Sequence, residues 1–450
     1  MTELREALDA LAREREPLGD RAAAPEELWG RGVRRKRART AVTALVAVLV
    51  LAVGAGVGSW LPGALPRGIA PAASPGELRV PRTVATPSPW ASGTAEAGPP
   101  GRLAVVWSAP RHTSWSHVEE APFGISAATG GYRFLDLPHL AGLDQLALSP
   151  DGRYLAYWTT GTVGGRPLPP AATVTRMRVV TGVAVYDTTT GRVVRDAVSS
   201  RHGIDPQGLQ WVGDHALVLS YGFRVTRSAS DRIHTFAWHP GDGDPQQLRG
   251  DPLPFFGTAT DARGGLVVPA GNDVRQYADL TAVEARQGRR IALPPKHYAQ
   301  VTLRGDRVVA VQDGSSPSTI DGRSWLVAGT VGTDGRAHLA PVHRALVTRL
   351  LGWERSGRLV VQGVGRSAQQ WPLLELDPGS LTLHRVGSIR PGSSWSTQPV
   401  FATGVVARGT AARPGPSHVT DPRLAVGLGV GAALLVLVAG GLVRRRRARG

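Results

Sequence analysis

Cysteine is absent from the 450 residues of the chain. The protein therefore forms no disulfide, no Cys-ligated zinc site, no iron–sulfur centre and no Cys nucleophile. The lack of disulfides leaves export open, because a domain of this length buries enough surface to fold without them. Lysine is also scarce, at positions 36 and 296 only, so arginine carries nearly all of the positive charge.

Recognisable catalytic motifs are missing as well. The sequence holds no G-x-S-x-G nucleophile elbow, no H-E-x-x-H metalloprotease motif and no Walker A loop. We therefore predict that the protein is not an enzyme and has no catalytic residue and no cofactor.

Two segments contain potential metal ligands. The segment RHTSWSHVEE holds His112, His117, Glu119 and Glu120. In the loop that we expect there, a five-residue spacing does not by itself bring two imidazoles onto one ion. Asp242 and Asp244 in HPGDGDP could bind calcium, although Gly-Asp pairs more often form hairpin turns. We predict no metal site at either segment.

The net charge of +17 is unevenly distributed. Residues 1–40 hold ten Arg or Lys and eight Asp or Glu, residues 444–450 hold five Arg, and the middle of the chain keeps +10. Nucleic-acid binding would need a basic face with interleaved aromatic residues. The clustered arginines instead flank two hydrophobic segments, so we predict no nucleic-acid partner.

These two segments are predicted membrane spans. Residues 41–61 and residues 424–443 carry no charge, and each is long enough as a helix to cross about 30 Å of hydrocarbon. Both must be helical, because lipid cannot satisfy an open backbone. A cleaved signal peptide is the alternative for residues 41–61, with cleavage near residues 54–56, but the charged head and the apolar run are both too long for one.

The charges beside the spans set the topology. Positive flanks remain cytoplasmic, and the flanking residues are Arg34, Arg35, Lys36, Arg37 and Arg39 before the first span and Arg444, Arg445, Arg446 and Arg447 after the second. We predict a multi-pass protein of the plasma membrane with both ends cytoplasmic and the central region outside.

Small residues occur at matching depths in the two spans. Gly54 and Gly58 form one GxxxG pair, and Gly427 and Gly431 form another. Such pairs let helices approach closely, so we predict that the spans pack against each other or against a second copy. The alternative is that glycine is simply common in membrane helices.

The remaining segments complete the predicted domain organisation. We expect a cytoplasmic head (1–40), a Pro-rich stalk (62–100), one large domain (101–408), a linker (409–423) and an Arg-rich tail (444–450). The composition of 56 Gly, 35 Pro and 12 Trp against 2 Met favours turns and short strands over packed helices.

One pattern recurs in the large domain: a turn containing Gly or Asp, followed by a short apolar run. Copies include SPDGRYLAYW, VGDHALVLSY, LRGDRVVAV and ERSGRLVVQ, and a last copy, ATGVVARG, covers residues 402–409. The turn residues Gly101, Gly152, Asp214, Gly264, Gly305, Gly357 and Gly404 lie 41 to 62 residues apart. Second hairpins are expected at residues 183–194, 236–248, 328–339 and 373–384, which makes four strands per repeat.

This period predicts an all-β fold: a six- or seven-bladed β-propeller flanked by two transmembrane helices. A β-sandwich, which has no such period, is the second choice. The turn Ser149, Pro150, Asp151 and Gly152 with its following strand resembles the repeat of TolB-type and WD-like propellers. The copy at Val212, Gly213 and Asp214 lacks the proline, and no copy carries a terminal Trp-Asp dipeptide. With its two spans, the whole chain resembles membrane-anchored propeller proteins of high-GC Gram-positive bacteria, a resemblance that implies the fold and leaves the function open.

The function hypotheses follow from this architecture. The first is a non-enzymatic binding or scaffold protein that holds a protein, peptide or cell-wall ligand outside the membrane, with the long segments Ser108–Phe123 and Thr159–Thr175 as candidate recognition loops. We expect most tryptophans to pack in the core. The alternative is a transmembrane regulator, in which the amphipathic segment 2–16 docks a cytoplasmic partner such as a sigma factor. A propeller enzyme is third, and the sequence leaves the oligomeric state open.

Overall fold

A computed structural model gives the structure of the protein. It describes residues 77–168, 178–226, 229–255, 257–313, 324–365, 370–392, 397–417, 419 and 421–449. The chain divides into two compact units, one of residues 66–420 and one of residues 1–65 with 421–450. We call the described part of the first unit, residues 77–419, the folded domain. The predicted head, the first span, Gly54, Gly58 and Arg34–Arg39 lie outside the described residues.

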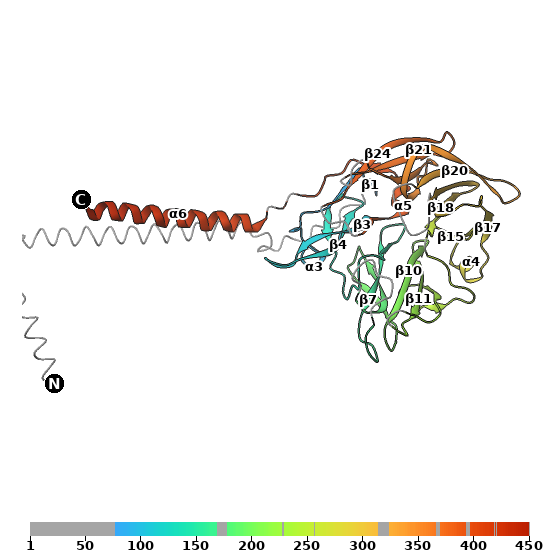
Figure 1. Cartoon of the computed structure of the whole chain (residues 1–450), viewed down its shortest axis with the longest axis horizontal. Coiled ribbons are helices and arrows are strands. Elements are labelled where there is room, and N and C mark those ends of the chain that lie inside the picture. Colours follow the sequence, from blue (N-terminus) through green and yellow to red (C-terminus); the bar gives the residue numbers. More distant parts are fainter. Residues whose placement is uncertain are drawn as a thin grey trace, which may run out of the picture. The chain divides into compact units, whose positions relative to one another are not determined.

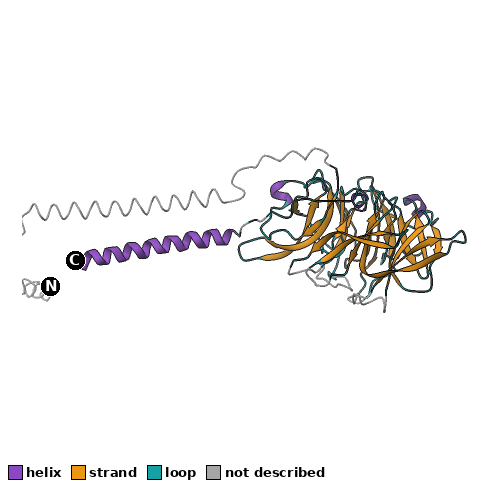
Figure 2. Cartoon of the chain, turned by 90° about the horizontal axis from the view of Figure 1, so that it is seen from above, coloured by secondary structure: helices purple, strands orange, loops and turns teal. Residues whose placement is uncertain are grey.

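The folded domain is all-β, as the sequence predicts, and Figure 2 shows strands throughout it with only short helices. Antiparallel units of four strands follow one another along the chain. The first contains β3 (Leu103–His112), β4 (Val118–Ser126) and β5 (Tyr132–Phe134), together with the late strand β25 (Val400–Phe401).

The second sheet contains two such units. One unit is β6 (Ala147–Leu148), β7 (Tyr154–Thr160), β8 (Val180–Asp187) and β9 (Val193–Ala197), and the other is β10 (Ile204–Val212), β11 (Ala216–Phe223), β12 (His234–Trp238) and β13 (Gln246–Gln247). The pairing of Ile204 with Val180 joins β10 to β8. A separate sheet follows, made of β14 (Ala259–Thr260), β15 (Leu266–Ala270), β16 (Asp273–Tyr277) and β17 (Arg289–Ala292), with helix α4 (Leu280–Glu284) between its last two strands.

The last sheet again joins two units, here through one long strand, β21 (Ala337–Trp353). Its first half pairs with β20 (Trp325–Val331), which continues to β19 (Arg307–Gln312) and β18 (Tyr298–Arg304). Its second half pairs with β22 (Leu359–Gly363), followed by β23 (Trp371–Asp377) and β24 (Thr382–Arg390). The four hairpins expected from the sequence are confirmed by the pairs β8–β9, β12–β13, β20–β21 and β23–β24.

The two ends of the folded domain are paired with each other. Strand β25, near the C-terminal end, lies antiparallel to β3 with Val400 opposite Val106. Strand β1 (Val80–Pro81) lies parallel to β26 (Thr410–Ala411), and β2 (Thr83–Ala85) lies parallel to β24. Figure 1 shows the blue and cyan strands of the N-terminal part meeting the orange and red elements of the C-terminal part. We call these pairings the clasp; they close the series of sheets into a propeller-like ring.

Consecutive units share their hydrophobic cores. Along β19, Val308 and Ala310 pack in a cluster with β15–β17, whereas Val309 and Val311 pack in a cluster with β22. Alternate residues of a strand point to opposite faces, so both faces of this strand are buried. An unbroken apolar run such as VVAV is therefore the sequence signature of a sheet packed between two others.

The expectation that most tryptophans are core residues is confirmed for Trp211, Trp238, Trp353 and Trp371, which are buried. Trp115 and Trp325 are the exceptions, with 52% and 45% of their surfaces exposed. Trp395 lies outside the described residues.

The structure differs from the sequence prediction at both domain boundaries. Residues 77–100, expected as an extended stalk, contribute β1, β2 and helix α3 (Thr94–Ala97), and Val84 is fully buried. Residues 410–411, expected in the linker, form β26. The predicted stalk was wrong at these residues because its high proline content was taken to exclude strands, whereas Pro is tolerated in edge strands of two or three residues such as these.

The last repeat copy also differs. Residues 403–406 form helix α5 (Thr403–Val406) in place of a strand. The reason is the clasp: β3 already supplies the second strand beside β25, so the chain after β25 has no strand position left to fill.

In the second unit, the described residues form helix α6 (Pro422–Arg449), which includes the predicted span 424–443. Within the described residues, α6 alone is long and apolar enough to cross a membrane, and its candidate span, Pro422–Arg445, is unburied. Arg444 and Arg445 continue this helix beyond its apolar part.

Candidate functional site

The turn Ser149–Gly152 joins β6 to β7. The Asp151 carboxylate accepts hydrogen bonds from the Ser149 hydroxyl at 2.7 Å and from the Arg153 amide at 3.0 Å. Gly152 has a φ of 75°, in the left-handed region that favours glycine. Ser149, Asp151 and Gly152 therefore have a local structural role, since the two side chains and the glycine conformation stabilise the turn itself.

The equivalent turns of successive units are connected in a closed cycle of hydrogen bonds, which we call the turn ring. The donors and acceptors are Asp151 N to Asp214 Oδ1 (3.0 Å), Gly213 N to Gly264 O (2.9 Å), Ala262 N to Leu303 O (3.0 Å), Arg304 Nη2 to Arg355 O (2.9 Å), Arg355 N to Ala407 O (2.9 Å) and Gly404 N to Pro150 O (2.8 Å). Helix α5 thus completes the ring between the turn after β21 and the turn after β6. The recurring Gly and Asp residues of the sequence lie where one unit is fastened to the next.

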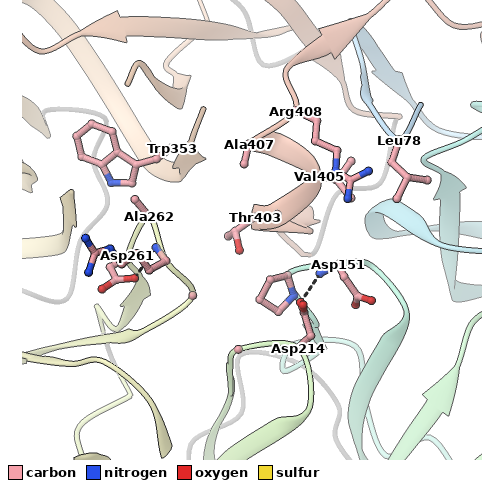
Figure 3. Close-up of a pocket in the computed structure, with 15 residues that line it drawn as sticks. Leu78, Asp151, Asp214, Asp261, Ala262, Trp353, Thr403, Val405, Ala407 and Arg408 are labelled. Carbon is pink, nitrogen blue, oxygen red and sulfur yellow. Dashed lines mark hydrogen bonds between the residues drawn. The ribbon is translucent and has the colours of Figure 1, made fainter. Parts of the chain in front are cut away.

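A cavity of about 230 Å³ lies inside the turn ring (Figure 3). Its lining comes from the turns, from helix α5 and the two residues after it, and from Leu78 and Trp353. Figure 3 shows α5 between Trp353 on one side and the Asp151–Asp214 pair on the other. The volume would admit a small molecule or several waters.

The three carboxylates of this cavity are already engaged. The Asp261 carboxylate accepts from the Gly265 amide at 2.8 Å and from the Gln276 side chain at 2.7 Å. Asp214 accepts from the Asp151 amide, and burial together with the nearby Asp151 carboxylate raises the pKa of Asp214. Each carboxylate stabilises a turn by accepting hydrogen bonds, so these three residues have a structural role in the turn ring.

The lining of the cavity offers little for catalysis. Thr403 is the one hydroxyl among the lining residues, and no His or Lys lies among them. General acid–base or nucleophilic chemistry needs a base within hydrogen-bond reach of a nucleophile. The lining residues supply no such pair.

A second candidate site lies at the hairpin of β3 and β4. The segment Ser108–Phe123, expected as a loop, is mainly strand, and only residues 113–117 connect β3 to β4. The strands extend because their residues pair in register up to His112 and Val118. We call residues 112–118 the hairpin tip.

Aromatic rings gather at this tip. The His112 ring stacks on Trp90 with a centroid distance of 4.0 Å and an angle of 13°. Trp115 meets Trp90 edge-on at 6.3 Å. The segment before β3 is fastened here as well, because the His112 amide donates to the Pro89 carbonyl at 2.9 Å.

The hairpin continues into a wider surface, which we call the loop surface: residues 108–123, 135–145 and 159–168. Leu135 N donates to Pro122 O at 2.8 Å, and Thr160 N donates to His139 O at 2.7 Å, so the three segments are joined. Burial and the nearby Glu120 carboxylate raise the pKa of Asp144. Residues 169–175 of the second predicted recognition loop lie outside the described residues.

Several of the potential metal ligands take part in other contacts. His112 stacks on Trp90, and Glu119 is the cross-strand partner of Arg111. Asp242 N donates to His239 O at 3.0 Å in the turn between β12 and β13. Among the described residues, no group of three His, Asp or Glu side chains has an arrangement that could hold a metal ion.

Several features of these sites were missed at the sequence level. Helix α5 looked like another turn and strand, and the clasp joins residues about 300 apart, a separation at which local patterns carry no signal. Trp90 lay in the expected stalk, so its stacking on His112 was not foreseen. The Asp near several turns was visible as a repeat, but the hydrogen bond between Asp214 and the Asp151 amide of the neighbouring turn was not.

Comparisons with known proteins give similar folds only. No family model matches the chain, and no curated protein matches it. Among solved structures, TolB from Acinetobacter baumannii is 13% identical with a TM-score of 0.39, over 69% of this chain and 69% of that one. Dipeptidyl peptidase 4 from Porphyromonas gingivalis is 8% identical with a TM-score of 0.37, over 66% of this chain.

The chain spans 51% of the length of the peptidase, which is about half. The Dos1 propeller is 12% identical with a TM-score of 0.32, over 55% of this chain and 61% of that one. Since these TM-scores are low, the propeller-like fold is assigned here from the strand pairing of the chain itself.

Proposed function

We propose that this protein is a non-enzymatic, membrane-anchored binding or scaffold protein. Its folded domain is a six-bladed β-propeller, each four-stranded unit being one blade, and it presents the loop surface to a protein, peptide or cell-wall ligand. Helix α6 is the anchor. Because arginines at a span end remain cytoplasmic, Arg444–Arg447 would orient the folded domain to the outside.

The observation that carries the proposal is the contrast between the turn ring and the loop surface. In the turn ring, the carboxylates hold turns and the backbone groups bond to the next unit. On the loop surface, residues 113–120, 138–139 and 164–167 are all exposed. A rigid ring that displays an exposed segment is the usual arrangement of a recognition module.

The anchor proposal includes helix packing. At Gly427 and Gly431, an added Cβ would meet nothing within 4 Å, so this face of α6 is open among the described residues. We propose that the pair contacts either the predicted first span or a second copy of α6, since small residues let helices approach closely.

Two measurements test the proposal. A membrane-impermeant maleimide added to intact cells should label a cysteine introduced at Ser356, an exposed serine of the turn between β21 and β22, and labelling only after lysis would place the domain on the cytoplasmic side. A photo-crosslinking residue at Glu119 should capture a cell-envelope ligand, while the same residue at Ser380, an exposed position between β23 and β24, should not. Equal products from both positions would count against the loop surface.

The regulator alternative rests on residues 1–40. Deleting residues 2–30 tests it, because a regulator would lose control of transcription while a pure binding protein would keep its ligand and leave transcription unchanged.

A further inference from the structure

The hairpin tip lies beside the place where the chain leaves the folded domain. The Ser88 hydroxyl donates to the Val419 carbonyl at 3.2 Å, and the Trp90 amide donates to the same hydroxyl at 3.3 Å. Trp90 in turn stacks on His112 of the tip. Val419, Ser88, Trp90 and His112 thus form one connected group.

The covalent chain limits how far this group can be from the anchor. Thr420 and Asp421 alone separate Val419 from Pro422, the first residue of α6, so the Cα atoms of Val419 and Pro422 are at most about 11 Å apart. This limit follows from bond geometry. A bilayer entered by α6 would therefore begin close to Trp90 and the tip.

The composition of the tip suits the polar boundary of a bilayer. The connecting residues are Thr113, Ser114, Trp115, Ser116 and His117, without a carboxylate or an arginine, and all five are exposed. Trp115 exposes 52% of its surface, although six tryptophans of this domain are buried to 9% exposure or less. Tryptophan is enriched at membrane interfaces, because its indole combines a large apolar ring with one hydrogen-bond donor.

We propose that the hairpin tip, with Trp90 and Trp115, inserts into the headgroup region of the bilayer beside α6. This inference rests on the proposed membrane anchor. Its consequence is that the folded domain is held at two points, the chain at Val419 and the tip, which fixes its tilt on the membrane. The exposed residues of the loop surface outside the tip, 119–120, 138–139 and 164–167, then face the ligand.

A sugar ring is a weaker candidate for this place. A glycan platform needs an open aromatic face, and one face of Trp90 is already covered by His112 at 4.0 Å while Trp115 stands at 64° to it. A lipid interface makes no such demand, because it accepts an indole in any orientation that buries its ring and leaves its N–H near water.

The absence of native cysteine makes the test direct, since each introduced cysteine is the one label site. The full chain would be reconstituted into phosphatidylcholine vesicles that contain brominated phosphatidylcholine, with an environment-sensitive fluorophore on Ser116→Cys. The matched control is Ser356→Cys, an exposed serine of the turn between β21 and β22, and Leu435→Cys in α6 reports the anchor.

We expect the fluorophore at position 116 to be quenched several-fold more than the one at position 356, and the one at position 435 to be quenched most. Trp115→Ser in the Ser116→Cys chain should lower the quenching at position 116 towards the level of position 356. Since Trp115 is exposed, this change leaves the fold intact.

Other outcomes separate the two proposals. Quenching at position 435 with equal signals at positions 116 and 356 would overturn the tip contact and leave the anchor standing. No quenching at position 435 would overturn the anchor and the tip contact together. A response at position 116 to soluble cell-wall fragments in detergent, without quenching by brominated lipid, would overturn the lipid contact in favour of a glycan.

Discussion

Alanine at Gly152 should destabilise the folded domain more than alanine at Gly305, although both residues occupy the same position in their repeats. Gly152 has a φ of 75° and Gly305 a φ of 65°, so an added methyl group costs each about the same backbone strain, roughly 1 kcal/mol. The difference comes from the surroundings. A Cβ at Gly152 would lie 2.0 Å from the Leu103 carbonyl oxygen, whereas one at Gly305 would meet nothing within 4 Å.

The clash falls on a contact between units. The Leu103 amide donates to the Gly152 carbonyl at 2.8 Å, so the methyl group would push β3 away from the turn after β6. Relieving such overpacking costs about 1–3 kcal/mol. We therefore expect Gly152→Ala to lower the free energy of unfolding by about 2–4 kcal/mol and Gly305→Ala by about 1 kcal/mol.

Urea unfolding of the full chain in detergent, followed by tryptophan fluorescence, measures both values, because most described tryptophans of the domain are buried. The slope of the unfolding curve should be the same in both variants. Equal destabilisation by the two alanines would refute the reasoning, since it would mean that the turn after β6 does not touch β3.

Three further predictions each concern a single residue and its control. Trp353→Phe removes the hydrogen bond that Trp353 Nε1 donates to the buried Thr302 hydroxyl at 3.0 Å, and it should lower the free energy of unfolding by about 1–2 kcal/mol. The control, Trp325→Phe at an exposed position, should leave the urea midpoint unchanged. Burial raises the pKa of Asp187, but hydrogen bonds from Thr189 and Arg153 outweigh it and lower that pKa from 3.8 to about 2. The ionised Asp187 should therefore stabilise the folded domain above pH 4, and this contribution should be lost between pH 4 and pH 2. In Asp187→Asn, this part of the pH dependence of the urea midpoint should disappear. An unchanged pH profile would contradict the lowered pKa of Asp187. Leu435→Arg, in the middle of the candidate span, should cost about 3 kcal/mol of insertion and shift the protein out of the membrane fraction, while Leu424→Arg near its end should not; equal fractionation would speak against α6 as an anchor.

The repeat could be predicted from the sequence because the interactions that stabilise each turn are between residues close together in the chain. The Asp151 carboxylate, for example, accepts a hydrogen bond from the amide of Arg153, only two residues later in the sequence. The apolar runs were equally readable, since burial of both strand faces removes the usual alternation. These two signals were sufficient to predict four-stranded units and an all-β domain.

The clasp and the candidate sites could not be predicted in the same way. Strands β1 and β26 have two residues each, too few for a recognisable period, and they pair across about 330 residues. The hairpin tip depends on Trp90 reaching His112 from another segment. Such contacts are products of the closed ring, and the residues that make them have no local pattern.

The pairing of β25 with β3 is the central claim, because it closes the ring. Val106 and Val400 are cross-strand partners, whose Cα atoms in an antiparallel pair lie about 4.5–5.5 Å apart, within the range that a disulfide spans. In the cysteine-free chain, Val106→Cys with Val400→Cys should form an internal disulfide on oxidation, seen as a faster band on a non-reducing gel. The pair Tyr186→Cys and Val193→Cys, within the β8–β9 hairpin, is the positive control. A disulfide in the control and none between positions 106 and 400 would show that the ring is open.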